Sequence, residues 1–271
     1  MIYLVLVLFG ALSGATTVLF GFGGGFVVVP VLYGVMRTLH GMDDLIGQSA
    51  MHIAVATSTC VMIVSSVLAT RKHHRAGNIA REYVWPLAGY IAAGALLGAL
   101  AATRADGGFV RHAFIIYLGV TILDCLLRQG FMSRPDDTAP RALGRATAMG
   151  GGVVIGMIAA FLGVGGSVMT VPLLRRRGLP MAKAAAMANP LSLPVALTGT
   201  LAYLAAAREL PHALAPWIVG YVDVLAFAAL ALGSLAGIRL AAPLIPRIPD
   251  ALHARVYVLL LMLVMVSMLA L

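Results

Sequence analysis

The chain has few charged residues. Only 11% of its 271 residues are Asp, Glu, Lys or Arg, while 61% are hydrophobic. A soluble domain of this length needs a polar surface that this composition does not supply. The sequence therefore predicts an all-α polytopic membrane protein, whose apolar helices cross a hydrocarbon layer about 30 Å thick.

Cysteine and the motifs of metal chemistry are also scarce. Cys60 and Cys125 both lie inside apolar runs, so no disulfide framework is expected. No HExxH motif occurs, and Phe26 stands at the third-glycine position of a GxGxxG motif. The adjacent His73 and His74 are too few for a di-iron oxygenase and are expected to contact lipid headgroups from a basic loop. The sequence thus predicts no metal and no cofactor, and an intramembrane enzyme is the least favoured class.

The formal net charge of +9 raises the question of a nucleic-acid partner. The basic residues, however, cluster in short loops between apolar runs rather than over one binding face. The expected partners are therefore the lipid bilayer and a small solute, with no nucleic acid. A homo-oligomer is left open.

Eight apolar runs follow one another along the chain. Six of them have the length of one helical crossing, about 20 residues. They are 45–70, 84–103, 109–127, 182–206, 216–238 and 254–271. The other two, 1–36 and 146–174, are longer and contain the glycine clusters GFGGG and GVGG. Each of these is either a bent crossing or a hairpin that enters and leaves on one side.

The distribution of Lys and Arg favours two hairpins. With hairpins at both glycine clusters, 15 of the 19 basic residues lie on one side, whereas eight single crossings divide them almost evenly. The loops on the basic side are 71–83, 128–145, 175–183 and 239–255. By the positive-inside rule these loops are cytoplasmic, which places both termini outside.

Each half of the chain then holds one hairpin and three crossings. The second half, 146–271, begins on the opposite side from the first, 1–127, with the polar linker 128–145 between them. The halves would therefore form an inverted repeat. Matching positions are Gly14 and Gly156, Gly21 and Gly163, Gly23–Gly24 and Gly165–Gly166, Pro30 and Pro172, and the pairs Gly94/Gly98 and Gly233/Gly237.

The glycine clusters predict a binding site at mid-membrane. Return arms of about 16 Å and about 10 Å would bring the two tips together near the midplane. Free N–H groups ahead of a helix N-terminus suit an anion. The candidate ligands are the backbones of Gly23, Gly24, Gly25, Gly165, Gly166 and Ser167, the Thr57 and Ser58 hydroxyls and the Asn189 amide. The alternative is that the glycines only permit close packing and that the hydroxyls bond the preceding helical turn.

His52 and Asp223 are the candidates for carrying a coupled proton. Each lies seven residues into its predicted run, about 10 Å below the outer surface. Ionisable groups at such depth are functional candidates, and histidine titrates near neutral pH. The alternative for each is a structural hydrogen bond between packed helices.

Four stretches resemble the TauE/SafE family of sulfite and sulfonate exporters, also called the toluene-sulfonate uptake permease family. They are GFGGGFVVVPVL at 21–32, AVATST at 54–59, TRKHHRAGNI at 70–79 and GVGGSVMTVPLL at 163–174. The resemblance covers nearly the whole chain. It implies a secondary transporter of the bacterial inner membrane that moves small sulfur-containing or carboxylated anions, with export and proton coupling as options.

One stretch departs from that family's pattern. The second half has Ala188-Asn189-Pro190 where the first has Ala56-Thr57-Ser58, and many relatives keep Thr-Ser in both. An anion channel would share the same lining residues, so it remains the alternative to a carrier that works by alternating access.

Overall fold

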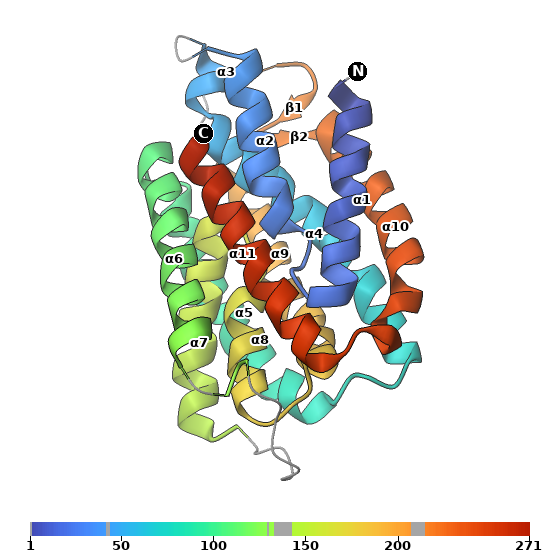
Figure 1. Cartoon of the computed structure of the whole chain (residues 1–271). Coiled ribbons are helices and arrows are strands. Elements are labelled where there is room, and N and C mark those ends of the chain that lie inside the picture. The colour runs from blue at the N-terminus through green and yellow to red at the C-terminus, as the bar shows by residue number, and fades with distance from the viewer. Residues whose placement is uncertain (1, 42–43, 129, 133–142, 207–214) are drawn as a thin grey trace.

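The computed structural model describes residues 2–41, 44–128, 130–132, 143–206 and 215–271, almost all of them helical (Figure 1). Seven of the described helices are long and apolar enough to cross a membrane. They are α1 (Ile2–Phe20), α4 (Ala50–Arg75), α5 (Arg81–Ala102), α6 (Gly107–Leu127), α7 (Arg145–Leu162), α10 (Val224–Ala241, continued by the 3₁₀ turn Ala242–Arg247) and α11 (Asp250–Ala270). The prediction of an all-α polytopic membrane protein is confirmed.

The first apolar run contains two helices. α1 ends at Phe20, and α2 (Gly25–Leu39) returns toward the end of the molecule where α1 began (Figure 1). The reversal requires glycine, because Gly21, Gly23 and Gly24 have φ values of 77°, 69° and 92°, which residues with a Cβ atom rarely adopt.

The run 146–174 is divided in the same way. α7 ends at Leu162, Gly163 has a φ of 69°, and α8 (Ser167–Arg176) runs back toward the start of α7. α1 and α7 begin at opposite ends of the molecule, and the N- and C-termini lie at the same end (Figure 1). The two broken runs therefore enter the helical bundle from opposite directions.

Glycines bring α1 against α10 at very close range. A Cβ atom added to Gly14 would lie 2.2 Å from the Ser234 carbonyl oxygen, and one added to Gly237 would lie 1.9 Å from that of Ala11. Such distances leave room only for glycine, as in other small-residue helix contacts.

α5 and α7 make the corresponding contact. A Cβ atom at Gly98 would lie 2.0 Å from the Met157 carbonyl oxygen, and one at Gly156 would lie 2.1 Å from that of Ile91. The long arm of each broken run thus packs against a helix from the other half of the chain.

α4 and α9 (Met181–Ala206) form the centre of the bundle. α9 is 26 residues long but is not among the seven apolar spans, because it carries Asn189, Ser192 and two prolines. Most of its residues are buried. Since protein rather than lipid surrounds much of α9, it can carry polar side chains that a lipid-facing helix would not tolerate.

Two predicted spans differ from the structure at their first residues. In the run 45–70, a short helix α3 (Leu45–Gln48) precedes α4, which begins only at Ala50. In the run 216–238, strands β1 (Ile218–Val219) and β2 (Val222–Asp223) pair antiparallel before α10 begins. These strands are rich in β-branched residues, and hydropathy alone does not distinguish them from a helix. Most of the linker 128–145 lies outside the described residues.

Candidate functional site

The two glycine loops meet inside the bundle. A Cβ atom added to Gly25 would lie 2.5 Å from the Gly163 carbonyl oxygen. Gly23 and Gly165 also share two neighbours: their added Cβ atoms would lie 2.9 Å and 2.6 Å from the Ser192 Oγ, and 3.3 Å and 3.2 Å from the Met62 Sδ. The structure therefore brings the two predicted backbone sites together.

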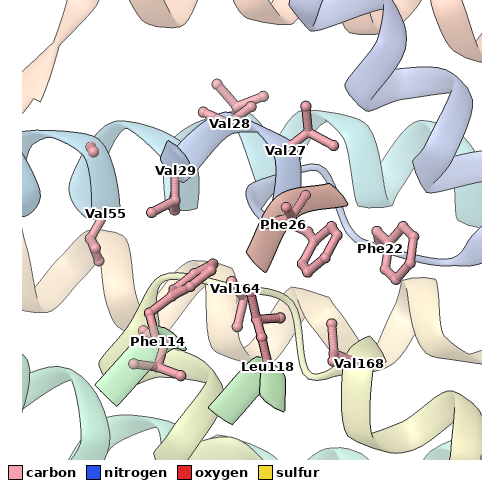
Figure 2. Close-up of a cluster of buried hydrophobic side chains, with 14 of the residues drawn as sticks. Phe22, Phe26, Val27, Val28, Val29, Val55, Phe114, Leu118, Val164 and Val168 are labelled. Atoms are coloured by element: carbon pink, nitrogen blue, oxygen red, sulfur yellow. The ribbon is translucent and has the colours of Figure 1, made fainter. Parts of the chain in front are cut away.

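Protein encloses both loops completely. Residues 21–25 and 163–167 are all buried. On one side, the loops contact a buried apolar cluster. It includes Phe26, Val164 and Val168, together with Phe114 of α6 (Figure 2). The polar partners of the loops lie instead on α4 and α9. The site therefore has one apolar wall and one polar wall.

Among the described residues, six amide N–H groups of the loops have no backbone acceptor, whereas those of Gly21, Gly163 and Val164 bond the last turns of α1 and α7. Within the described part of the chain, Gly23, Gly24 and Gly25 donate no backbone hydrogen bond, and neither do Gly165, Gly166 and Ser167. Buried backbone N–H groups nearly always have a partner. Two sets of unpaired donors at the N-termini of α2 and α8 form a place of positive potential.

The carbonyl groups of the loops, in contrast, are paired with hydroxyls. Ser58 donates to the Gly163 carbonyl oxygen at 2.9 Å and to that of Val55 at 2.7 Å. Ser65 donates to the Gly23 carbonyl oxygen at 3.0 Å. The serine hydroxyls therefore bind the carbonyl oxygens of the loops and do not occupy the loop N–H groups.

A further hydroxyl from α1 holds the first loop. Ser13 donates to the carbonyl oxygen of Gly24 at 2.7 Å and is fully buried. The first loop is therefore fixed from two helices, α1 and α4.

Thr57 and Asn189 make other contacts. The Thr57 hydroxyl oxygen accepts a hydrogen bond from the Asp223 N–H at 3.0 Å, which ties α4 to β2. The Asn189 Nδ2 donates to the Ala185 carbonyl oxygen at 3.2 Å, and its Oδ1 is buried without a partner. The structure places Ser58 at the loops but directs Thr57 to the strand.

Sequence reasoning missed Ser13, Met62, Ser65 and Ser192. A signal for two of them was available, because Ser58, Met62 and Ser65 are spaced i, i+4 and i+7 and so share one helix face. Ser192 lies on α9 between the two loops, where its Oγ also donates to the Ala188 carbonyl oxygen at 3.0 Å.

The contacts of the two loops match each other. Gly163 lies against Val55 as Gly21 lies against Ala185, and Gly24 lies against Ser65 as Gly166 lies near Val195. This spacing pairs Ser58 with Ala188. Matching Ala56-Thr57-Ser58 to Ala188-Asn189-Pro190 by sequence instead pairs Ser58 with Pro190. The contacts shift that pairing by two residues.

His52 and Asp223 lie nearer the helix ends than predicted. His52 is in the first turn of α4, and its Nε2 lies 3.1 Å from the Ala105 carbonyl oxygen. Asp223 precedes α10 and caps it by accepting from the Ala226 N–H at 2.9 Å. Burial raises the pKa of Asp223, against the opposing effect of its backbone hydrogen bonds. No hydrogen bond or ion pair joins His52 and Asp223 among the described residues.

Two other histidines hold the end of α1. The His73 Nε2 lies 2.8 Å from the Val18 carbonyl oxygen, and the His253 Nε2 lies 2.7 Å from that of Leu19. His73 is fully buried, so the expectation that it contacts lipid headgroups is wrong, whereas His74 is exposed. The last turn of α1 is thus fixed immediately before the glycine loop.

Among the described residues, no group of three or more His, Cys, Asp or Glu side chains is placed to hold a metal ion. The chemistry available at the loops is that of backbone N–H groups and serine hydroxyls.

Two broken runs that meet inside a helical bundle, with unpaired backbone at the junction, are an architecture that membrane transporters use. Residues 6–268 match the family model for the sulfite exporter TauE/SafE, and the chain belongs to this family. The resemblance found in the sequence is thereby confirmed.

Two relatives support the same class. A probable membrane transporter protein of Haemophilus influenzae is 24% identical over 98% of this chain and 97% of its own length. A probable membrane transporter protein of Methanocaldococcus jannaschii is 25% identical over 76% of this chain and 73% of its own length. No solved structure gives a significant match. The protein is a multi-pass membrane transporter of a small-molecule substrate.

Proposed function

We propose that the protein is a secondary transporter of small anions such as sulfite, organic sulfonates or related carboxylates. The observation that carries this proposal is the pair of unpaired N–H sets at Gly23–Gly25 and Gly165–Ser167, brought into contact by the two loops. Backbone donors at helix N-termini favour negative charge without any cationic side chain. The family's printed description, sulfite exporter, supports this class of substrate.

The absence of a cation at the loops suits transport. Within the described loops and their partners Ser58, Ser65 and Ser192, no Lys or Arg contributes to the site. A full charge would hold an anion tightly, whereas dipoles and hydroxyls permit both binding and release. An anion at this place would be bound through N–H groups, with Ser192 between the loops.

The proposal includes alternating access between two halves related as an inverted repeat. Matching contacts at the two loops support this relation, and so do two lateral grooves. One, about 360 Å³, lies between α6, α7 and α8 and is lined by Val168 and Pro172. The other, about 90 Å³, lies between α1, α2 and α11 and is lined by the corresponding Phe26 and Pro30. Their unequal size fits one conformation of a two-state cycle.

Export across a bacterial inner membrane, with both termini outside, completes the proposal. Proton coupling through His52 or Asp223 is part of it, because both are ionisable groups at the end of the bundle where the termini lie. Their observed contacts also fit a purely structural role, so variants at both positions are needed.

The test is transport of sulfite into proteoliposomes, measured against sulfite concentration, pH gradient and voltage. A carrier gives saturable flux that a proton gradient drives. Flux that follows voltage without saturating would instead identify a channel. In the same assay, Gly24→Val should abolish flux, because Gly24 has a φ of 92° and its added Cβ atom would lie 2.2 Å from the Ser65 Oγ. The matched control is Gly150→Val, where an added Cβ atom meets nothing within 4 Å.

A further inference from the structure

A polar cavity lies at the far end of α2 from the glycine loop. It has a volume of about 410 Å³, and its lining includes Tyr33, Arg37, Gln48, Asp106 and Arg111. These residues come from α2, α3, the N-cap of α6 and α6 itself. The cavity therefore lies at the end of the molecule that carries both termini.

Two arginines share one aromatic ring in this cavity. The Arg37 Cζ lies 5.9 Å and the Arg111 Cζ 5.8 Å from the centroid of the Tyr33 ring. Each guanidinium is within the range of a cation–π interaction. The ring gathers two positive charges at one place, where they repel each other unless an anion lies nearby.

Neither arginine is neutralised by a carboxylate in the described part of the chain. Asp106 also lines the cavity, but its carboxylate accepts hydrogen bonds from the Gly108 and Phe109 N–H groups at 2.8 Å and 3.2 Å. Asp44 is paired with His40 at 2.7 Å. The Asp106 and Asp44 carboxylates thus have hydrogen-bond partners other than the two arginines.

Arg111 also has an unmet donor. Its Nη2 donates to the Met268 carbonyl oxygen at 3.2 Å, but its Nε is buried without a hydrogen-bond partner. A guanidinium presents donors in a planar fork that matches the oxygens of a carboxylate or a sulfur oxyanion.

The corresponding place in the other half of the chain is different. There Arg175, which corresponds to Tyr33, is fully buried and forms an ion pair with Asp250 at the start of α11. The arginine of that half has an acidic partner within the protein. Arg37 and Arg111 have no such ion pair among the described residues, although Asp106 also lines their cavity.

We propose that Arg37 and Arg111 form a second anion site, which holds a small oxyanion or carboxylate between the solvent and the glycine loops. This inference rests on the proposed anion transport. The site differs in chemistry from the loops, because it uses two full charges in a half-open cavity. Such a site raises the local concentration of anions at the end of the molecule that carries both termini, and its effect falls with ionic strength.

The first experiment locates the anion. Crystals or cryo-cooled samples of the whole protein are soaked in selenate, whose selenium gives an anomalous signal, and the peak heights are compared. A peak between Arg37 and Arg111 that disappears in Arg37→Gln/Arg111→Gln supports the proposal. No peak there at concentrations that saturate transport overturns it.

The second experiment measures sulfite flux at low and high salt. Arg37→Gln and Arg111→Gln should each raise KM about tenfold, leave the maximal rate nearly unchanged and reduce the salt dependence. The matched control is Arg104→Gln at the same end of the molecule, whose guanidinium donates, among the described residues, one hydrogen bond, to the Leu100 carbonyl oxygen of its own helix end. An unchanged KM in both variants, or an equal change in the control, contradicts the proposal.

The two proposals fail in different ways. Loss of the selenate peak at the loops in Gly24→Val, with the peak at Arg37 and Arg111 retained, supports two sites. A selenate peak at Arg37 and Arg111 without one at the loops would contradict anion binding at the loops. It would still support the site at the two arginines. Thermal unfolding of each variant shows whether it has folded, and Arg37→Lys and Arg111→Lys, which keep the charge, should recover part of the affinity.

Discussion

The Ser58 hydroxyl lies 2.9 Å from the Gly163 carbonyl oxygen, so a helix of the first half holds the loop of the second. About two turns further along α4, Ser65 holds the loop of the first half through the Gly23 carbonyl oxygen at 3.0 Å. A single face of α4 therefore sets the position of both loops. Any movement of α4 would displace the two sets of N–H donors together.

Replacing Ser58 by alanine should destabilise the protein without removing any group that binds the anion directly. The variant leaves the buried Gly163 carbonyl oxygen without its side-chain partner, which costs about 1–3 kcal/mol. Thermal unfolding in detergent measures the loss. The matched control is Thr121→Ala, because within the described ranges the Thr121 hydroxyl bonds only the Tyr117 carbonyl oxygen of its own helix. Equal unfolding temperatures for the two variants would contradict the role given to Ser58.

Alanine at the two loops should have unequal effects. Gly24 has a φ of 92°, which costs about 1–2 kcal/mol for a residue with a Cβ atom, and the added atom would meet the Ser65 Oγ. Gly166 has a φ of −57°, and its added Cβ atom would lie 3.1 Å from the nearest atom, the Ile155 Cγ2. Gly24→Ala should lose most sulfite flux while Gly166→Ala keeps it. Equal loss in both would show that backbone conformation is not the deciding factor.

The contact between α1 and α10 should not tolerate one added methyl group. A Cβ atom at Gly237 would lie 1.9 Å from the Ala11 carbonyl oxygen, so Gly237→Ala must push the helices apart, at a cost of about 1–3 kcal/mol or more. Gly150→Ala on α7, which meets nothing within 4 Å, should be neutral or slightly stabilising. The yield of monodisperse protein and its unfolding temperature distinguish the two.

Loss of Asp250 and loss of Arg175, which form an ion pair, should destabilise the protein by different amounts. Arg175 is fully buried, whereas the Asp250 side chain is 28% exposed and also accepts from the Met181 N–H at 2.8 Å. Asp250→Leu leaves a buried charge and should cost about 3 kcal/mol or more, while Arg175→Met costs less.

The surface pair of Arg128 and Asp124 supplies the control for that comparison. Its atoms are 3.7 Å apart and the Arg128 side chain is 71% exposed, so Arg128→Met should change stability by no more than about 1 kcal/mol. A double-mutant cycle at Arg175 and Asp250 separates their mutual interaction from the other bonds of each residue. A coupling energy near zero would contradict the assignment.

Stability should decrease with rising pH because of Asp223. Burial raises the pKa of Asp223 above the ordinary value of 3.8, so the folded protein binds this proton more tightly than the unfolded chain. The free energy of unfolding therefore falls as the pH rises from the ordinary value through the raised one. Asp223→Asn keeps the cap on α10, since Asn caps a helix about as well, and should flatten this decrease.

Asp44 supplies a control, because its pKa is shifted in the opposite direction. The hydrogen bond from His40 lowers the pKa of Asp44, so the contribution of this exposed residue is lost as the pH falls through the lowered value. Chemical unfolding of both Asn variants across acid and neutral pH measures the two slopes. Slopes of the same sign would contradict the environment assigned to Asp223.

Much of the fold could be predicted from two features of the sequence, the glycine clusters and the distribution of Lys and Arg. A glycine cluster in an apolar run is costly in a lipid-facing helix, and the distribution of Lys and Arg distinguished broken runs from single crossings. The strands at Ile218–Val219 and Val222–Asp223 could not be predicted in that way, because hydropathy measures partition into lipid and not backbone conformation. The basic end of α4 was read as a loop, although the helix continues to Arg75.

The candidate site was predictable in its backbone and less so in its side chains. Glycine positions follow from the conformations that the loops require. Neighbouring hydroxyls on a helix point about 100° apart, so Thr57 and Ser58 cannot both face the loops, and only the packing of α4 decides between them. Ser192 neighbours both loops because α9 packs between them, and no pattern in the sequence indicates that packing.

The close contact between α1 and α10 has a consequence for biosynthesis. Gly10 and Gly14 lie against Leu230 and Ser234, so α1 leaves the ribosome long before its partner exists. At about 5–20 residues per second, the delay is on the order of ten seconds or more. During that time α1 remains in the membrane with its glycine face covered only by lipid or by an insertion chaperone. The glycine face of α1 is therefore packed long after α1 itself is made, and a ribosome that stalls before α10 leaves that face without its partner.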